Sequence, residues 1–405
     1  MNARTVTRLD VYKGHARAGE LRRTERGAVF EYAPDYVSAH RGDALAAVAF
    51  TLPVRAEAYE VHGVNVHPFF AGLLPEGLRL KALVRAVKTS EDDLFSLLVA
   101  SGSDTVGDVS VAPVGEAPRE RAPVADLPRL GEASFRELLA KSLQYGDGGG
   151  DVSFAGVQPK VSAAVISFPV RAGGEGNAYI LKMAPPEYPR LVENEAFFMN
   201  VARAAGIDVA PTRVVHDREG VAALLVERFD RLAAKDGALT RVHQEDACQV
   251  LDRYPADKYR LTLADVSRAL DVCAAPVVER LKLLRQQALA YLIVNGDLHA
   301  RNVSVRVTGG RVELTPGYDI LSTLPYGDRR LALAMEGRDD HVKAAHFAAF
   351  GERVGVRRAA VEGMLALLCA RVAPWVDRLA EINLDARQTR HLARVMTERL
   401  KELLG

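Results

Sequence analysis

The sequence contains few cysteines and no excess of either charge. Its three cysteines, Cys248, Cys273 and Cys369, are scattered without a paired spacing. This excludes a disulfide framework and a cysteine-based zinc cluster, and it suits a reducing cytoplasm. Lys and Arg number 53 and Asp and Glu 52, a formal net charge of +1. No global field therefore draws the chain onto nucleic acid or anionic lipid.

Long hydrophobic runs are also missing. The first residues, Met1 to Tyr12, lack the apolar run of a signal peptide, and the apolar stretch Ala288 to Val294 is too short to span a bilayer. We therefore expect a cytoplasmic protein without a membrane partner. The chain lacks the phosphate-loop, dinucleotide-fold, H-E-x-x-H and G-x-S-x-G motifs, which disfavours the corresponding NTPases, dehydrogenases, metalloproteases and serine hydrolases.

The length of 405 residues, with 48% hydrophobic and 26% charged residues, is that of two or three globular domains. Alternating apolar residues dominate the first half and helical spacing dominates the second, which predicts an α+β protein. Prolines 113, 118, 123 and 128 indicate a linker. We predict an N-terminal β-rich subdomain over 1–111, a linker over 112–130, a second sheet-bearing lobe over 131–235 and a mostly helical lobe over 236–405.

Local patterns predict individual elements within these segments. Helices are expected over 68–87, 92–100, 194–205, 281–294 and 390–404, where apolar residues recur at three- and four-residue spacing. Strands are expected over 161–168, 178–183 and 221–226, and a hairpin is expected over 303–307 and 312–314.

The sharpest chemical feature is the segment from Asp297 to Asn302. A carboxylate and an amide five positions apart match the catalytic loop of kinases, in which the acid receives or orients the acceptor proton and the amide oxygen binds magnesium. Asp319 follows seventeen residues after Asn302, where a second magnesium carboxylate is expected. The alternative is that these residues merely cap a helix and form a turn.

Lys182 lies inside an apolar predicted strand, where a buried ammonium needs an anionic partner. A nucleotide phosphate is one such partner, and Glu193 or Glu195 on the following helix is another, as in the lysine–glutamate pair of protein kinases. A surface-facing Lys182 is the alternative. Nearby, Gly146, Gly148, Gly149, Gly150 and Gly156 give a weak signal for a phosphate-binding loop.

Taken together, these motifs resemble the HipA family of bacterial serine/threonine kinases, the toxins of HipBA-type toxin–antitoxin modules, along nearly the whole chain. The matching segments are 70–77 (FAGLLPEG), 103–107 (SDTVG), 154–160 (FAGVQPK), 226–231 (VERFDR), 243–246 (HQED), 295–302 (NGDLHARN) and 318–319 (YD).

The resemblance implies a two-lobed, protein-kinase-like fold behind an additional N-terminal β-rich subdomain, with ATP and Mg²⁺ as cofactors. It implies that Asp297 is the catalytic base, that Asn302 and Asp319 bind the metal, and that Lys182 contacts phosphate. His299 joins the catalytic and nucleotide-binding set, and Glu227 and Phe229 would hold adenine at the hinge. The implied glycine loop comprises Ser153, Phe154, Ala155, Gly156, Val157, Gln158 and Lys160.

Ser153 matches the family's regulatory serine, whose autophosphorylation expels the loop and inactivates the kinase. A phosphoserine would carry nearly two negative charges into a phosphate site, so its exclusion of ATP is physically reasonable. The chain departs from the family's Asp-Gly-His-Ala-Lys-Asn loop at Leu298 and Arg301. We expect activity to survive, although Arg301 cannot fill a role that needs the compact charge of a lysine.

Three functions are compatible with this sequence. The first is a protein kinase toxin that phosphorylates an aminoacyl-tRNA synthetase, by family precedent the glutamyl enzyme, to arrest growth. The second is a corepressor bound to a HipB-like helix-turn-helix antitoxin, with operator DNA contacted mainly through the antitoxin. The third is a small-molecule or lipid kinase of related fold, because the Asp-x-x-x-x-Asn pattern is widely shared.

Overall fold

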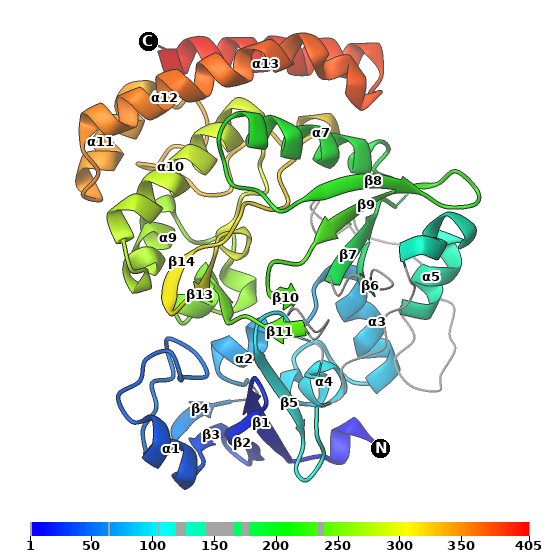
Figure 1. Cartoon of the computed structure of the whole chain (residues 1–405), viewed down its shortest axis with the longest axis vertical. Coiled ribbons are helices and arrows are strands. Elements are labelled where there is room, and N and C mark those ends of the chain that lie inside the picture. Colours follow the sequence, from blue (N-terminus) through cyan, green and yellow to red (C-terminus); the bar gives the residue numbers. More distant parts are fainter. Residues whose placement is uncertain are drawn as a thin grey trace.

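The computed structural model describes residues 2–63, 65–103, 105–118, 127–142, 166–171, 178–185, 187–233 and 239–404. An N-terminal sheet lies at the bottom of Figure 1, a second sheet and its helices occupy the middle, and α11 (Ala344–Arg353), α12 (Arg358–Val372) and α13 (Ala386–Leu404) lie at the top. Helices and antiparallel sheets are thus mixed along the chain, which confirms the predicted α+β class. The two-lobed arrangement behind an N-terminal subdomain is also confirmed.

The N-terminal subdomain is built on a five-stranded antiparallel sheet of order β4-β3-β2-β1-β5. Phe30 and Phe70 pack edge to face in its core with ring centroids 5.4 Å apart. Gly19 is required on β2, because a Cβ there would lie 2.3 Å from the carbonyl oxygen of Glu31 on the next strand. The elements are β1 (Arg8–Lys13), β2 (Ala16–Thr24), β3 (Gly27–Tyr32), α1 (Pro34–His40), β4 (Tyr59–His62), α2 (Pro68–Gly72), α3 (Gly77–Val87), α4 (Leu94–Ser101) and β5 (Val109–Pro113).

The prediction of one helix over 68–87 was wrong, because the segment forms two helices, α2 and α3. Pro75 cannot donate a backbone hydrogen bond and disfavours helical geometry at the residue before it. Gly77 then adopts a left-handed φ of 56° at the start of α3. The break leaves residues 73–75 of the connection facing the kinase-like core, where they become part of a cavity wall.

The second sheet has the order β6-β7-β9-β8 and is antiparallel throughout. The predicted strand over 178–183 is β7, and only the end of the strand predicted over 161–168 lies in the described residues, where it begins β6. Helix α7 packs against β8 and β9. The elements are α5 (Phe135–Ser142), β6 (Ile166–Arg171), β7 (Ala178–Met183), α7 (Leu191–Ala204), β8 (Thr212–His216) and β9 (Ala222–Glu227).

The C-terminal lobe is mostly helical, with the buried helix α10 in its core. The predicted hairpin is present: Gly309 and Gly310, with φ of 57° and 74°, form its two-residue turn, which matches strand twist without strain. The remaining elements are β10 (Arg231–Ala233), β11 (Leu239–Arg241), β12 (Gln244–Asp246), α8 (Ala247–Val250), α9 (Leu263–Ala269), α10 (Pro276–Leu292), β13 (Ser304–Thr308) and β14 (Arg311–Leu314). The predicted domain boundaries stay predictions, and residues 119–126 of the linker lie outside the described residues.

One segment of the described chain, Arg358–Ile382, is long and apolar enough to cross a membrane, with a mean hydropathy of 1.5. The sequence analysis did not anticipate it, because its apolar residues are interrupted by single charges. Val361, Leu365 and Leu368 of this segment are almost fully buried in the core of the C-terminal lobe. One side of the segment therefore packs into this core, and 33% of its apolar window is buried.

The N-terminal subdomain is joined to the hinge by hydrogen bonds to the segment 105–107. Arg231 donates to the carbonyl oxygens of Thr105 (2.8 Å) and Gly107 (3.0 Å), and Arg241 donates to that of Gly107 (2.9 Å). Asp230 accepts from the Gly107 backbone N–H at 3.0 Å. Two of the motifs found in the sequence, 103–107 and 226–231, thus meet at this joint.

A second joint is a buried cluster of four titratable groups. His243 lies within 2.7 Å of the Lys13 ammonium, 2.8 Å of the Asp108 carboxylate and 2.9 Å of the Glu245 carboxylate. Burial and Lys13 would lower the pKa of His243, but its hydrogen bonds to Asp108 and Glu245 outweigh them and raise that pKa. Lys13 ends β1 and Asp108 precedes β5, both in the N-terminal subdomain. His243 and Glu245 lie at β12, in the C-terminal lobe.

This cluster predicts a pH dependence of stability. Because the folded-state pKa of His243 is raised, its stabilising contribution is complete below the unfolded pKa of about 6.5 and is lost as the pH rises through the folded value. We expect His243→Gln to reduce the fall in unfolding free energy between pH 6 and pH 8 by about 1 kcal/mol. Urea unfolding of both proteins at several pH values measures this, and parallel pH profiles would contradict it.

Candidate active site

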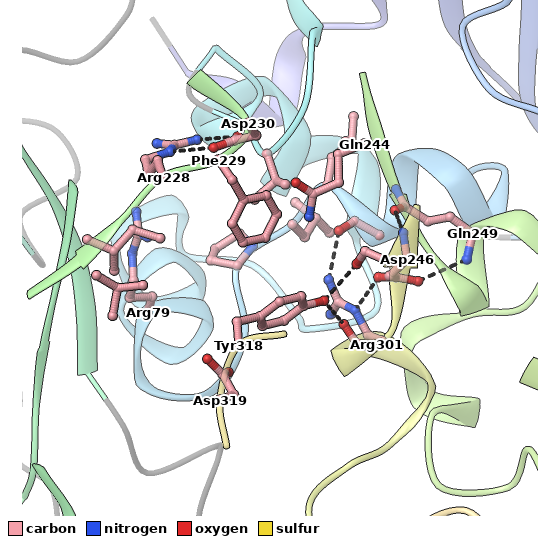
Figure 2. Close-up of a pocket in the computed structure, with 18 of the residues that line it drawn as sticks. Arg79, Arg228, Phe229, Asp230, Gln244, Asp246, Gln249, Arg301, Tyr318 and Asp319 are labelled. Atoms are coloured by element: carbon pink, nitrogen blue, oxygen red, sulfur yellow. Dashed lines mark hydrogen bonds and ion pairs between the residues drawn. The ribbon is translucent and has the colours of Figure 1, made fainter. Parts of the chain in front are cut away.

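A cavity of about 400 Å³ lies between the N-terminal subdomain and the two lobes of the core. Figure 2 shows the rings of Phe229 and Tyr318 in its middle, with Arg79 on one side and Arg301 with Asp246 on the other. The two ring centroids are 5.7 Å apart. Chain segments far apart in sequence therefore share one cavity, which also includes Lys182, Glu227 and Asp319.

Lys182 is held in this cavity by two carboxylates. Its side chain leaves β7 and is almost fully buried, with Nζ 2.5 Å from Oε1 of Glu195 and in contact with Asp319. Burial alone would lower the pKa of Lys182, but the two carboxylates outweigh it and raise that pKa. The lysine is therefore a permanent cation, and the alternative of a surface-facing lysine is wrong.

The helix partner of Lys182 is Glu195 rather than Glu193. The two glutamates are two positions apart on α7 and so point to different sides of the helix. Glu195 is buried towards the sheet, whereas Glu193 forms an ion pair with Arg190 at 2.9 Å. Burial raises the pKa of Glu195 to about 7.

The predicted catalytic loop begins with an unusual backbone. Val294 has a φ of 58°, rare for a β-branched residue, and Thr323 holds this turn by donating its N–H to the Val294 carbonyl at 2.8 Å. Gly296 must lack a side chain, because a Cβ would lie 2.6 Å from the carbonyl oxygen of Arg330. The chain thereby turns out of α10 and delivers Asp297 to the site.

Asp297 is almost fully buried, and its surroundings fix both its backbone and its carboxylate. Its N–H donates to Oδ1 of Asn295 (2.8 Å), and its carbonyl accepts from Nδ2 of Asn302 (2.8 Å). Its Oδ1 accepts a hydrogen bond from the hydroxyl of Tyr259 at 2.6 Å. An ionised carboxylate held in this way can receive or orient a proton from an acceptor hydroxyl.

His299 is a neutral imidazole in this site. Its ring is edge to face with Tyr259, and its Nε2 lies 4.0 Å from Oδ1 of Asp297. Burial and the nearby Lys258 lower the pKa of His299 to about 3. Neither ring nitrogen hydrogen-bonds to any described residue, although the ring is buried. Such nitrogens can bind a ligand only as neutral donor or acceptor.

Asn302 and Asp319 carry side-chain oxygens of the kind that magnesium prefers, and of the two Asp319 lines the cavity. The Asn302 amide nitrogen is used by the Asp297 carbonyl, and no residue in the described ranges donates to its oxygen. Asp319 has a φ of 57°, a conformation that aspartate tolerates better than most residues. The described residues contain no cluster of three or more His, Cys, Asp or Glu side chains suited to a metal. Magnesium commonly uses one or two protein oxygens completed by phosphates and water, which is what these two residues could support.

The hinge lines the same cavity. Glu227 ends β9, and Phe229 follows it with its ring over the cavity. Among the residues that the structure describes, none accepts a hydrogen bond from the Phe229 backbone N–H. This donor and the apolar side chains of Ile180 and Val226 could hold a flat heterocycle. The predicted glycine-loop residues Ser153, Phe154, Ala155, Gly156, Val157, Gln158 and Lys160 lie outside the described residues.

Sequence reasoning missed three residues at this site. Glu76, in the connection to α3, forms ion pairs with Arg301 (2.7 Å) and Lys258 (3.0 Å). Arg79 lines the cavity, its Nε is buried, and no described residue pairs with it. Tyr259 contacts Asp297. The motif over 70–77 contained Glu76, but nothing in the local sequence showed that this carboxylate reaches the catalytic loop.

Arg301 uses the planar shape that distinguishes it from lysine. Its guanidinium donates to Asp246 (2.8 Å) and to the carbonyl oxygen of Gly72 (2.9 Å), and it pairs with Glu76. Asp246 is itself buried at the start of α8. Arg301 therefore connects the N-terminal subdomain to the predicted catalytic loop.

We expect Arg301→Lys to lower the unfolding free energy by about 1–3 kcal/mol, because three different guanidinium nitrogens meet the three acceptors and the one nitrogen of an ammonium cannot reach them together. Arg306→Lys is the matched control, since Arg306 pairs only with Glu313 on the neighbouring strand among the described residues. That partly buried pair between neighbouring strands is worth about 0.5–1 kcal/mol. Urea unfolding measures both variants, and equal losses would contradict the role of the guanidinium fork.

Comparison with known proteins places most of the chain in one family. The profile "HipA N-terminal domain" matches residues 9–112, and the profile "HipA-like C-terminal domain" matches residues 152–376. Protein Y4mE of Sinorhizobium fredii is 32% identical over 392 residues, which cover 93% of this chain and 91% of that protein. The serine/threonine-protein kinase toxin HipA of Shewanella oneidensis is 29% identical over 343 residues, 76% of each chain.

The fold is also that of a solved structure. The HipA chain in the Shewanella oneidensis complex of HipA, HipB and operator DNA matches with a TM-score of 0.75 and 24% identity, over 98% of this chain and 97% of that one. The sequence matches and the shared fold lead to the same conclusion. The protein belongs to the HipA family of kinases.

Proposed function

We propose that this protein is an ATP- and Mg²⁺-dependent serine/threonine-protein kinase that acts as the toxin of a toxin–antitoxin pair. The observation that carries the proposal is the buried Lys182, fixed between Glu195 and Asp319 in the cavity that the hinge also lines. A permanent cation beside a carboxylate is an arrangement suited to binding nucleotide phosphates and their metal. The identity of the HipA relative as a serine/threonine-protein kinase toxin supports the same activity.

The cavity suits a nucleotide. Its volume lies within the usual range of about 300–1,000 Å³ for small-molecule sites. The apolar side chains of Ile180, Val226 and Phe229 would enclose the base, and the Phe229 N–H would donate to it. Lys182 would contact the phosphates. Arg79, a cation that pairs with no described residue, adds positive charge to the same cavity.

Phosphoryl transfer then needs little more than positioning and charge neutralisation. The acceptor hydroxyl oxygen forms a bond to the γ-phosphorus while the bond between that phosphorus and the bridging oxygen breaks, which releases ADP. Asp297 accepts the hydroxyl proton. Asn302 and Asp319 would hold Mg²⁺, which when bound neutralises charge on the phosphates. His299, beside Asp297, is a neutral imidazole. It therefore would not form an ion pair with the phosphates.

We extend the proposal to the protein's biology on the basis of its relatives. A related HipA is found in a complex with HipB and operator DNA, which supports a HipB-like helix-turn-helix antitoxin as partner and DNA contact through that antitoxin. An aminoacyl-tRNA synthetase is the proposed substrate, Ser153 the proposed site of self-inactivating autophosphorylation, and the cytoplasm the proposed location. Co-purification with a helix-turn-helix protein encoded beside the gene tests the partner.

The kinase activity is tested by incubating the protein with MgATP and measuring its intact mass and its phosphorylation sites. We expect one added phosphate, at Ser153, and ADP in equal amount. Titration with a fluorescent ATP analogue tests binding separately. A protein that neither binds the analogue nor forms ADP, alone or with cell extract as a source of substrates, would contradict the proposal. Turnover of sugars, aminoglycosides or inositol lipids would instead support a small-molecule kinase.

A further inference from the structure

We propose that Tyr259 is the positioning residue for the catalytic carboxylate, and that the N-terminal subdomain fixes Tyr259 through Glu76. The inference rests on the proposed kinase function. It adds an account of how the Asp297 carboxylate, the proposed general base, is held in place. Tyr259 lies in the segment between α8 and α9, outside every motif found in the sequence. Its hydroxyl contacts Asp297 and it is not among the residues that line the cavity, so we assign it an effect on Asp297.

The first step of the argument is the contact itself. The Tyr259 hydroxyl donates to Oδ1 of Asp297 at 2.6 Å, a short, charge-assisted hydrogen bond. Asn295 and Asn302 hold the backbone of Asp297, whereas Tyr259 holds its carboxylate. Fixing one oxygen of the carboxylate fixes the side-chain rotamer and therefore the direction of the other oxygen. That direction decides whether an acceptor hydroxyl can be reached.

The second step is that the ring of Tyr259 is itself clamped. His299 meets it edge to face, with ring centroids 4.8 Å apart and an interplanar angle of 84°. The Lys258 ammonium lies 5.4 Å from the ring centroid, within range of a cation–π interaction. The hydroxyl is therefore presented to Asp297 from a ring with little freedom.

The third step connects this ring to the N-terminal subdomain. Glu76 accepts hydrogen bonds from the Lys258 ammonium at 3.0 and 3.1 Å and pairs with Arg301 at 2.7 Å. The Lys258 carbonyl accepts from the N–H of Ala300, inside the catalytic loop, at 3.2 Å. Desolvation would raise the pKa of Glu76, but Arg301 and Lys258 outweigh it and lower that pKa to about 2. Glu76 thus stays negative. It holds Lys258, which precedes Tyr259, and Arg301, which lies two residues after His299.

The consequence concerns rate rather than affinity. A general base must be held close to its productive geometry, and a misplacement of about 1 Å can lower a rate about 100-fold. Neither Tyr259 nor Glu76 lines the nucleotide cavity. Loss of either contact should therefore slow phosphoryl transfer and leave nucleotide binding unchanged.

The experiment compares two tyrosines of the same segment. Tyr259→Phe removes the hydroxyl that contacts Asp297 and keeps the ring. Tyr254→Phe is the matched control, because its hydroxyl donates to the Val66 carbonyl at 3.1 Å, away from Asp297. For each full-length variant we would measure the single-turnover rate of phosphoryl transfer at saturating MgATP, the Kd of a fluorescent ATP analogue and the Tm.

We expect Tyr259→Phe to lower the saturated rate about 10- to 100-fold with Kd unchanged within twofold. Tyr254→Phe should keep the rate within twofold of the wild type, and Glu76→Gln should lower it by a smaller factor with the same Kd. A Tyr259→Phe rate equal to that of the wild type, or equal losses in both tyrosine variants, would overturn the inference. A wild-type protein that transfers no phosphate would overturn the proposed function instead.

Discussion

Asp297→Asn is expected to lower the rate of phosphoryl transfer by about 10²–10⁴-fold while the Kd for nucleotide stays within twofold. The amide has the size of the carboxylate and can still accept the hydrogen bond of Tyr259, but it cannot take up the acceptor proton. Asp297 does not line the nucleotide cavity, so binding should survive. The rate of phosphate incorporation, followed by intact mass, measures the first quantity, and titration with a fluorescent ATP analogue measures the second.

The control is Asp339→Asn, which changes an exposed aspartate that pairs with Arg330. Its rate should equal that of the wild type, and both variants should keep the wild-type Tm within a few degrees. A residual rate of Asp297→Asn within tenfold of the wild type would show that another group accepts the proton or that none is required.

Lys182→Met is expected to abolish measurable nucleotide binding at micromolar concentration and to destabilise the fold by about 3 kcal/mol. The methionine fills the space of the lysine but leaves Glu195 and Asp319 facing each other without their cation. Breaking a buried ion pair on one side leaves an uncompensated charge, which explains why the loss exceeds that of a surface pair.

The pH dependence of this destabilisation identifies its source. Burial raises the folded-state pKa of Glu195 to about 7 even beside Lys182, so its carboxyl takes up a proton more readily in the fold than in the unfolded chain. Stability is then lost as the pH rises from the unfolded value of about 4.3 to the folded value. Without Lys182 the folded pKa rises further, so the destabilisation should be larger at pH 8 than at pH 5.5.

The double variant Lys182→Met, Glu195→Gln separates stability from function. It removes one of the two facing carboxylates, so we expect it to recover most of the lost unfolding free energy and none of the nucleotide affinity. Urea unfolding and nucleotide titration of the three proteins provide the comparison. Wild-type affinity in either variant would show that Lys182 does not contact the nucleotide.

The elements that the sequence predicted well are those whose pattern is local. The strand with Lys182, the hairpin with the Gly309–Gly310 turn and the helix before the catalytic loop each follow from periodicity and turn residues within a short window. The helix over 68–87 was the exception. Its apolar spacing continues across Pro75, and only the backbone effect of the proline and Gly77 ends α2 and starts α3.

At the candidate site, the sequence indicated which residue types were present but could not pair them. Both Glu193 and Glu195 were plausible partners for Lys182, because the sequence does not say which side of α7 faces the sheet. Packing decides this, and it buries Glu195. Arg301 was noted as a departure from the family's lysine, yet its use as a fork became visible only when Asp246 and Gly72 were found around it.

The sequence by itself determined the α+β class and the order of the chemical groups, because these follow from spacings of a few residues, and its motifs carried the resemblance to the HipA family. The tertiary structure alone decided that the N-terminal subdomain forms part of the site. Glu76 and Tyr259 lie 221 and 38 residues before Asp297 along the chain, and only the folding of three distant segments onto one another brings them to the catalytic loop. Contacts of that separation depend on the packing of whole elements, which no local pattern encodes.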